Sequence, residues 1–230
     1  MKKVTIVTRA YNRLEYTIKC VNSVRDNTIY KNYEHLIVNN GSFDGTRAWL
    51  TWINLHCPEW FDRVVSLHLD SNRGDWGGLL AGLFYSADAD YIVQLDNDIQ
   101  VPVGWLTTMM HVLTSAKEDK IVQASRVGYR RSSRLEGNGD PCMIDGYNTV
   151  KIRRPVSCFI IKRSHFLEAL PSIDQNSGKY GKTELGKLLG VRKILDLEVD
   201  LIDGKQVSPK GTFINHEKYP RSSKAVYVKN

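Results

Sequence analysis

The sequence predicts an α/β fold, in which a mostly parallel central sheet is flanked by helices in a single domain. Short, continuous apolar runs alternate with helical patterns between residues 4 and 95, and this alternation is typical of a parallel sheet covered on both faces. Each apolar run ends in polar residues, as expected where buried strands reach solvent. A chain of 230 residues with 42% hydrophobic residues can bury the core that such a fold needs.

The first half of the chain contains four expected strands joined by three helices. Apolar residues at helical spacing predict a helix over about 13–27. Asp44 is expected to cap a second helix, which stops before Pro58, and a Leu- and Ala-rich segment predicts a third helix at 77–87. The expected strands are 4–8, 35–39, 64–69 and 91–95.

Beyond residue 100 the pattern loosens. Residues 126–150 are rich in Arg, Gly and Asn and predict an irregular excursion, while residues 178–190 predict a Gly-punctuated loop that runs into a helix. The other expected elements are helices at 105–114 and 164–170 and strands at 121–124, 156–161, 194–201 and 212–215.

The net charge of +7 is unevenly distributed. Residues 151–230 contain 16 Lys and Arg against 8 Asp and Glu, whereas residues 1–150 contain 16 against 17. A further cluster comprises Arg126, Arg130, Arg131 and Arg134. Such asymmetry indicates either an anionic partner or a solvated basic face. The partner would be nucleic acid, an acidic membrane surface or a phosphorylated substrate.

The cysteines and the hydropathy pattern favour a reducing, cytoplasmic setting. The four cysteines, at positions 20, 57, 142 and 158, form no Cys-x-x-Cys pair and lie mostly in apolar contexts. The sequence contains no uninterrupted apolar run near 18 residues, and its first apolar stretch is too short for a signal peptide.

The most informative segment is Asp96-Asn97-Asp98, which ends the apolar run that begins at Tyr91. Two carboxylates this close repel each other unless a cation lies with them. A hard divalent ion, Mg²⁺ or Mn²⁺, with phosphate oxygens completing its coordination is the natural partner. The alternative is a solvated Asp-Asn turn.

Four polar segments are expected to meet at one edge of the sheet, because the carboxyl ends of parallel strands define the ligand crevice. They are Thr8-Arg9, Asn39–Ser42, Asp70–Gly74 and Asp96–Asp98.

The sequence lacks two familiar nucleotide-binding motifs. Gly178–Thr183 lacks the first glycine of a P-loop, since residue 176 is Asn, and no Gly-x-Gly-x-x-Gly follows the first strand.

The ordered motifs resemble the family 2 glycosyltransferases of the GT-A fold, over about residues 3–110 and more loosely to about 217. The resemblance rests on the first strand with its Tyr-Asn-Arg turn (Val4–Arg13), on Asn39–Thr46, on Asn72–Gly78, and on Leu95–Asp98 followed by Pro102 and Gly104-Trp105-Leu106.

The resemblance implies an inverting transfer of a hexosyl or deoxyhexosyl group from a nucleotide sugar to an acceptor hydroxyl. Asp98 and His216 would bind Mn²⁺ or Mg²⁺, and Glu184 would be the catalytic base, with Asp145 and Asp174 as alternatives. Residues 1–110 would form the nucleotide-sugar-binding half and residues 111–230 the acceptor-binding half. The implied nucleotide-sugar residues are Thr8, Arg9, Tyr11, Arg13, Asn39, Asn72, Arg73, Gly74, Asp75, Asp96 and Asn97.

Two departures from the family pattern bear on the substrate and the base. Asn39 stands where the family usually has a carboxylate, so nucleobase recognition differs, although a UDP-sugar remains the favoured donor. Thr183-Glu184-Leu185 replaces the usual Glu-Asp pair. The basic C-terminal third indicates a glycan, lipid-linked or phosphorylated acceptor, or peripheral contact with a membrane.

Two other functions, nucleotidyl transfer and nucleic-acid binding, require features that the sequence lacks. A sugar-phosphate nucleotidyltransferase needs a Gly-rich loop after the first strand, where this chain has Thr8–Arg13. A basic nucleic-acid-binding α/β protein would carry aromatic–basic modules, which the sequence lacks, so nucleic acid is not expected as a partner.

Overall fold

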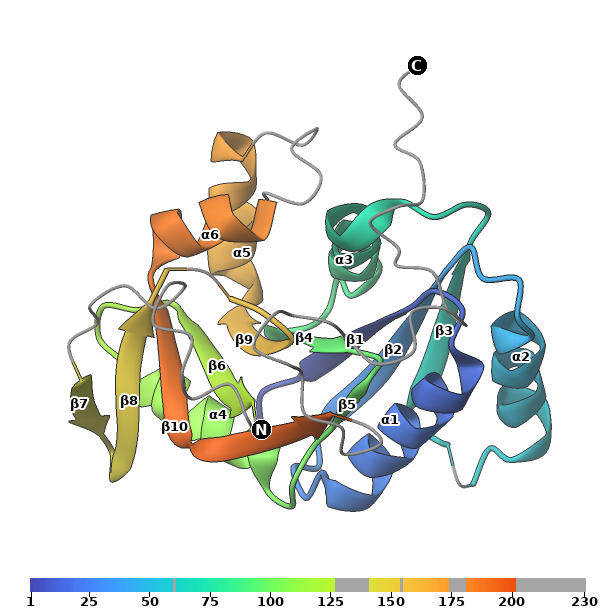
Figure 1. The fold of residues 1–230 in the computed structure, drawn as a ribbon, viewed down its shortest axis with the longest axis horizontal. Helices are drawn as coiled ribbons and strands as arrows, with labels where there is room; N and C mark the ends of the chain where they lie inside the picture. Colours follow the sequence, from blue (N-terminus) through green and yellow to red (C-terminus); the bar gives the residue numbers. More distant parts are fainter. Residues whose placement is uncertain (60, 127–140, 154, 174–180, 202–230) are drawn as a thin grey trace.

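The structure is a computed structural model that describes residues 1–59, 61–126, 141–153, 155–173 and 181–201. Its ten strands form one sheet, with nine in the order β3-β2-β1-β4-β9-β6-β10-β8-β7 and β5 attached to β10 (Figure 1). One large sheet therefore connects the two halves of the chain.

The nucleotide-sugar half expected at residues 1–110 contributes the parallel part of the sheet. β1 (Val4–Ala10) lies between β2 (Tyr33–Asn40) and β4 (Tyr91–Asp96), and β3 (Val64–Leu69) lies beyond β2. The direction in which strands are added reverses between β1 and β4. Such a reversal opens a crevice at the carboxyl ends of the two strands, which is where the polar segments of the sequence lie.

The second half adds antiparallel strands. β9 (Cys158–Lys162) lies between β4 and β6 (Ile121–Arg126) and is antiparallel to both. β10 (Val191–Leu201) runs parallel to β6, and its end pairs with β5 (Ile99–Gln100), directly after the Asp-x-Asp segment. The β7 (Pro141–Ile144) and β8 (Tyr147–Ile152) hairpin closes the sheet at the far edge.

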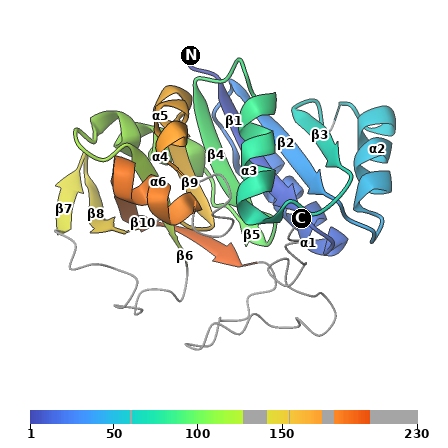
Figure 2. The ribbon, with the colours of Figure 1, turned by 90° about the horizontal axis from the view of Figure 1, so that it is seen from above.

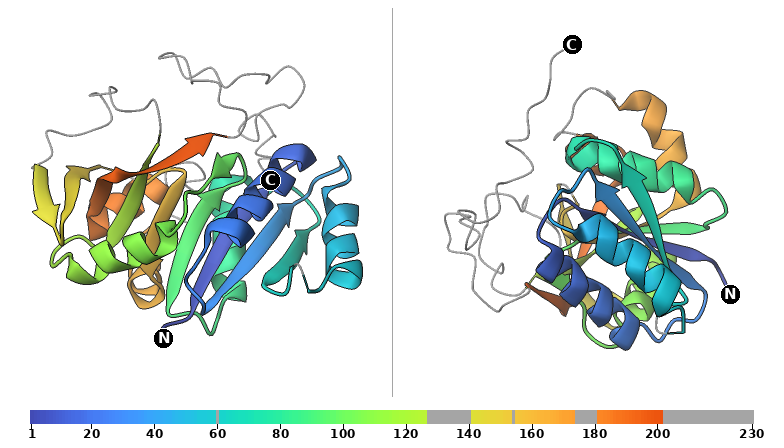
Figure 3. Two further views of the ribbon diagram at one scale, coloured as in Figure 1. Left: turned by 90° about the horizontal axis from the view of Figure 1, so that it is seen from below. Right: turned by 90° about the vertical axis from the view of Figure 1, so that its right-hand side faces the viewer.

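Helices cover both faces of the sheet (Figures 1 and 2). One face carries α1 (Leu14–Asn27), α2 (Thr46–His56) and α4 (Trp105–Ser115); the other carries α3 (Gly74–Tyr85), α5 (Arg163–Ala169) with the short 3₁₀ turn η1 (Leu170–Ser172), and α6 (Gly181–Leu189). Figure 3 shows α1, α2 and α4 together on the face seen from below. Among the described residues, no helix is both long and apolar enough to cross a membrane.

Alternate residues of the strands supply separate cores on the two faces, because successive strand side chains point in opposite directions. Ile6 of β1 packs in the cluster with Trp105 of α4, whereas Val7 packs in the cluster with Trp76 of α3 and Phe166 of α5. Burial raises the pKa of the Cys20 and Cys158 thiols, so these two cysteines behave as the small core residues that the sequence predicts.

Most expected elements are confirmed, with one correction. Residues 141–150 of the expected irregular excursion form, together with residues 151 and 152, the β7–β8 hairpin, which turns at Asp145-Gly146, both with positive φ (51° and 85°). An Asp-Gly pair is a strong hairpin signal that the composition of the segment obscured. Gly45 directly precedes α2, and the Asp44 carboxylate accepts the backbone N–H of Thr46 at the start of this helix (3.2 Å), as expected of a capping residue. The strand expected at 212–215 lies outside the described residues.

Substituting Gly82→Ala is expected to destabilise the fold. A β-carbon at Gly82 would overlap the buried Val7 side chain of β1, and overpacking costs about 1–3 kcal/mol, more than the helix propensity that alanine adds (about 1 kcal/mol). Urea unfolding would measure the loss. Because Val7→Ala removes the overlapping methyl groups, the Val7→Ala/Gly82→Ala protein should lose less stability than the two single losses added together; strict additivity would contradict this account.

Candidate functional site

The turns that follow β1 and β2 are joined by hydrogen bonds at the carboxyl edge of the sheet. Asn12 and Arg13 both have positive φ (53° and 64°), a conformation that needs local support in non-glycine residues. The Asn12 N–H donates to Ser42 Oγ (2.9 Å), and Asn12 Oδ1 accepts from the Phe43 N–H (3.0 Å). The Tyr-Asn-Arg turn is therefore held by the turn after β2.

Asp44 supports the beginnings of two helices. Its carboxylate accepts the backbone N–H of Leu14 (2.8 Å), the first residue of α1, and that of Thr46 (3.2 Å), the first residue of α2. A carboxylate at a helix N-terminus also complements the helix dipole. Asp44 thus has a structural role at this edge rather than a ligand-facing one.

The segment that opens α3 is anchored to the end of β2 through Asn40. Asn40 Nδ2 donates to Asn72 Oδ1 (2.9 Å) and to the Gly74 carbonyl (3.1 Å), and Asn40 Oδ1 accepts the Arg73 N–H (2.9 Å). A side chain at Gly41 would come within 2.6 Å of the Ser71 backbone, so this close approach requires glycine. Asn72, Arg73 and Gly74 are brought to the edge as the sequence predicts.

Each carboxylate of the Asp-x-Asp segment faces an arginine, Arg9 near the end of β1 or Arg13 in the turn that follows it. Arg9 Nη2 lies 2.6 Å from Asp96 Oδ1, and Arg13 Nη2 lies 2.9 Å from Asp98 Oδ2. Opposite charge at this distance offsets the repulsion between the two carboxylates. Asn97 points elsewhere, because its amide donates to the Thr17 hydroxyl of α1 (3.0 Å) in a buried contact.

Five side chains from four elements form a closed hydrogen-bonded circuit, which we call the polar ring. Arg9 pairs with Asp96 and also with Asp75 of α3. Gln94 of β4 donates to Asp96 Oδ1 (2.8 Å) and accepts from Lys182 Nζ of α6 (3.0 Å). Lys182 Nζ lies 2.8 Å from Asp75 Oδ2, which closes the ring. Its two cations and two carboxylates cancel in formal charge.

The two cations and the amide of the polar ring are largely removed from solvent, whereas the carboxylates Asp75 and Asp96 are 43% and 31% exposed. The Arg9 and Lys182 side chains are only 8% and 11% exposed, and Gln94 is fully buried. Burial lowers the pKa of Arg9, and the Asp96 carboxylate opposes that effect. Because a guanidinium stays charged even so, the pair persists as an ion pair.

The sequence reasoning missed Gln94 and Lys182. A fully polar amide inside the apolar run Tyr91–Leu95 is the signal that could have found Gln94, since a buried amide needs partners. Lys182 gives no such signal, because a lysine in a first helical turn is usually solvated.

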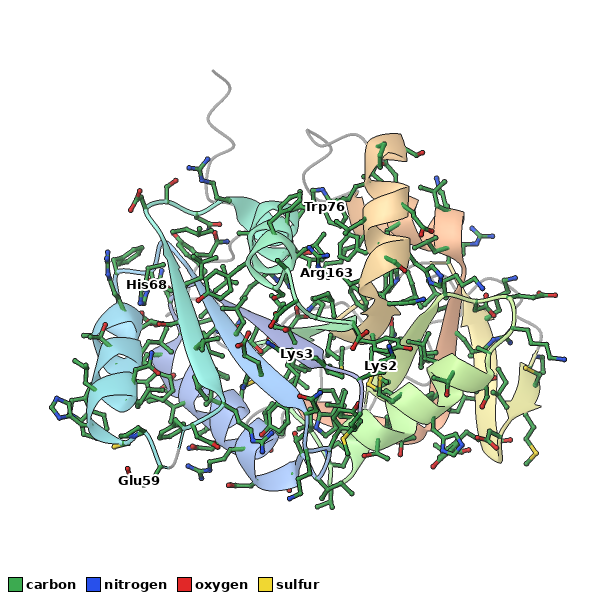
Figure 4. The ribbon with its side chains drawn as sticks, turned by 180° about the vertical axis from the view of Figure 1, so that it is seen from behind. Lys2, Lys3, Glu59, His68, Trp76 and Arg163 are labelled. Atoms are coloured by element: carbon green, nitrogen blue, oxygen red, sulfur yellow. The ribbon has the colours of Figure 1, made fainter. Side chains whose placement is uncertain are left out.

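Helix α6 packs closely on α3 beside the ring. A side chain at Gly181 would overlap the Trp76 indole, and the Trp76 and Phe166 rings lie 5.8 Å apart. Figure 4 shows Trp76 between α3 and the helices α5 and α6. Glu184 lies in the first turn of α6, and its Oε2 is buried with no hydrogen-bond partner among the described residues.

Other buried polar atoms at this edge also lack partners within the described part of the chain. They are Arg9 Nε, Asn72 Nδ2 and Trp76 Nε1. Buried polar groups are normally hydrogen-bonded. Arg9 pairs with Asp96, and Asn72 and Trp76 lie at the beginning of α3. Unpaired donors at these positions are consistent with a ligand rich in oxygen acceptors, such as a sugar or a diphosphate.

The expected nucleoside-pocket residues lie at different depths. Thr8 is fully buried and bonds His35 (2.8 Å), so it supports the edge from beneath. Asn39 is also buried; its Oδ1 accepts the Ser42 N–H (3.0 Å) and its Nδ2 donates to His68 Nδ1 (3.2 Å). Tyr11 is more open and meets the 77% exposed ring of Phe43 edge-on (6.2 Å between centroids).

Residues 5–164 match the family model "Glycosyl transferase family 2". The chain belongs to this family. Membership covers both the Asp-x-Asp segment and the strands that hold it, and it confirms the resemblance that the ordered motifs predict.

This family 2 chain is similar to known proteins in sequence and in fold. It is 29% identical over 119 residues to glycosyltransferase AglE of Haloferax volcanii, a stretch that is 51% of the chain and 38% of that relative. It also resembles the mannosyltransferase PcManGT of Pyrobaculum calidifontis, solved with GDP-Man and Mn²⁺ (TM-score 0.65, 16% identity), over 91% of the chain and 58% of that structure.

A second similar structure is S. aureus TarS 1-349 in complex with UDP-GlcNAc (TM-score 0.62, 13% identity). The alignment covers 94% of the chain and 63% of TarS 1-349. GalNAc-T7 with UDP, GalNAc and Mn²⁺ gives a TM-score of 0.65 at 12% identity, over 90% of the chain and 46% of that protein. These likenesses confirm the predicted GT-A fold. The chain spans 38% of AglE and under two thirds of each of these structures.

The family 2 chain presents two carboxylates, Asp96 and Asp98, at the place expected for a metal. The described residues contain no group of three or more His, Cys, Asp and Glu that could hold an ion, and His216 lies outside them. An all-oxygen donor set that leaves positions for phosphate oxygens fits Mg²⁺ or Mn²⁺.

Of the two alternative bases, Asp145 lies within the described residues. Asp145 lies in the β7–β8 turn, where it pairs with His111 and accepts from Ser115 Oγ (3.3 Å) of α4. It therefore faces the helix layer opposite α6 and is separate from the ring. Asp174 lies outside the described residues.

The stability of the protein should fall on acidification partly through His35. Burial lowers the pKa of His35 to about 3, so between pH 6.5 and 3 the unfolded chain binds a proton that the folded chain does not. That difference lowers the free energy of unfolding by about 1.4 kcal/mol per pH unit as pH falls. In urea unfolding between pH 6 and 4, the slope for His35→Gln should be shallower than the wild-type slope by about 1.4 kcal/mol per pH unit.

Proposed function

We propose that this chain is a metal-dependent, inverting glycosyltransferase that moves a hexosyl or deoxyhexosyl group from a nucleotide diphosphate sugar to an acceptor hydroxyl. Its donor would bind at the crevice between β1 and β4. The observation that supports this most is the pair of carboxylates at the end of β4, one held by Arg9 of β1 and the other by Arg13 of the turn after β1.

The surroundings of the pair support a nucleotide sugar as the ligand. Asn72, Arg73 and Gly74 are held at the same edge by Asn40, and the unpaired donors Asn72 Nδ2 and Trp76 Nε1 lie on the segment that begins α3. Such donors can bind sugar hydroxyls or phosphate oxygens. The nucleotide sugars and Mn²⁺ bound by PcManGT and GalNAc-T7 support the same ligand class.

Asp98 would bind Mn²⁺ or Mg²⁺, with His216 as a further ligand and Asp96 bound to the ribose or to the outer coordination of the metal. When bound, the cation would offset the charge that develops on the departing diphosphate. Arg13, which is paired with Asp98, would supply a second positive charge at the same place.

Glu184 would accept the proton from the attacking acceptor hydroxyl. Its buried, unpartnered Oε2 and its position on the helix that is tied to Asp96 through the polar ring support this role. The acceptor would be a glycan or a lipid-linked or phosphorylated molecule, recognised by the basic C-terminal third. That region would also provide any contact with a membrane surface.

The nucleotide is proposed to be UDP, with the more open Tyr11 against the base and the buried Thr8 and Asn39 forming the floor of the nucleoside pocket. Asn39 keeps one amide hydrogen and one carbonyl lone pair beyond its bonds to His68 and Ser42. It could therefore both donate to and accept from a pyrimidine edge. A GDP-sugar is the competing donor to include in any test.

Donor binding should depend on both metal and Asp98. At a nucleotide concentration about 100 times its Kd, binding contributes about 2.7 kcal/mol, which raises the Tm by about 5–10 °C for a protein of this size. We expect this shift with UDP- or GDP-sugars in the presence of Mn²⁺, and its loss without Mn²⁺ or in Asp98→Ala. Asp62→Ala, which removes an exposed carboxylate, is the control and should keep the shift. An equal shift in Asp98→Ala would overturn the metal assignment.

Glu184→Gln should separate catalysis from donor binding. The amide keeps the shape of the side chain but cannot take a proton, and loss of a general base lowers kcat by about 100-fold or more. Release of nucleoside diphosphate at saturating donor would measure kcat, and the Mn²⁺-dependent thermal shift would measure binding. Wild-type turnover in Glu184→Gln would exclude Glu184 as the base.

A further inference from the structure

The polar ring joins the two functional halves of the chain through one residue. Arg9, Asp75, Gln94 and Asp96 lie within residues 1–110, and Lys182 comes from α6. Lys182 is nearly buried and contacts one charged and one neutral member of the ring. Among the described residues, it is the ring's single link to the helix that carries Glu184.

Lys182 determines how Gln94 meets Asp96. An ammonium group can only donate, so it fixes Gln94 Oε1 toward α6 and Gln94 Nε2 toward Asp96 Oδ1 and the Ser157 carbonyl (3.2 Å). A flipped amide would place N–H against the ammonium and oxygen against the carboxylate. The orientation of α6 and the hydrogen bond received by Asp96 are therefore set by the same contact.

Lys182 also fixes the position of the helix itself. One residue earlier, Gly181 packs against the face of Trp76, with no room for a side chain. A rigid helix held at two consecutive residues has little freedom to slide or rotate, and Glu184 follows within one turn. The base proposed above is thereby held at a set position relative to the carboxylate that faces the donor.

We propose that Lys182 is a positioning residue: it fixes α6 against the Asp-x-Asp segment, so that Glu184 keeps a constant position relative to the donor. This inference rests on the proposed function. The ring would also keep the site from excess negative charge, because without Lys182 its formal charge is −1 beside an anionic donor.

The test compares Lys182→Met with Lys187→Met, a matched loss of an exposed lysine from the last turn of the same helix. Hydrogen exchange without ligand should be at least tenfold faster for the α6 amides in Lys182→Met, with α1 unchanged. Turnover of UDP-GlcNAc or GDP-mannose with Mn²⁺, using whichever stabilises the wild type, should lose at least tenfold in kcat at saturating donor. Lys187→Met should stay within twofold of wild type in both measurements, and Lys182→Arg should recover most of the loss.

A double substitution separates positioning from an independent effect. If Lys182 acts through Glu184, Lys182→Met should lower kcat by less than twofold in the Glu184→Gln background. Gln94→Met, which keeps the Lys182–Asp75 ion pair, is the second variant and should lose three- to tenfold with the same dependence on Glu184. Unchanged α6 exchange in Lys182→Met, or a full additional loss in the Glu184→Gln background, would overturn the inference. Wild-type turnover in Glu184→Gln would instead refute the proposed base.

Discussion

The electrostatic constraint on this molecule is the placement of two carboxylates, Asp96 and Asp98, at the end of one buried strand. Their mutual repulsion must be offset in the folded protein, and Arg9 and Arg13 supply the opposing charges. Arg9 extends from β1 itself, whereas Arg13 reaches Asp98 from a left-handed turn at Asn12-Arg13, which the turn after β2 supports. Much of the hydrogen bonding at the carboxyl edge follows from this one arrangement.

The same constraint reaches into the second half of the chain. Because Asp96 also accepts from Gln94, and Gln94 is oriented by Lys182, a helix more than 80 residues away in sequence is tied to the strand tip. Gly181 and Gly82 allow this approach, since a side chain at either would overlap Trp76 or Val7. Small residues at the contacts and charged residues beside them thus define how α3 and α6 lie on the sheet.

Local patterns in the sequence predict the first half well and the second half only in part. Continuous apolar runs and helical spacing identify β1 to β4 and α1 to α3, because the pattern of apolar residues within each segment reflects how that segment is buried. The Asp-x-Asp segment is predicted for the same reason, as charge follows directly after an apolar strand. The β7–β8 hairpin is missed because its short strands lie in a segment whose Arg, Gly and Asn content predicts an irregular loop. Gln94 and Lys182 of the ring are missed because they contact each other across 88 residues of sequence. Asn97 has the expected sequence position, yet its side chain points into α1.

The late position of β9 in the chain has a consequence for how the protein folds. β4 gains its second neighbour only when residues 158–162 arrive, and β5 is paired only by the end of β10, about 100 residues after it. Until then the strand that carries Asp96 has an open edge, which is prone to pairing with other chains. During synthesis, the parallel strands β1 to β4 can assemble first, and the site is completed last. Nascent chains released before residue 162 are therefore expected to aggregate.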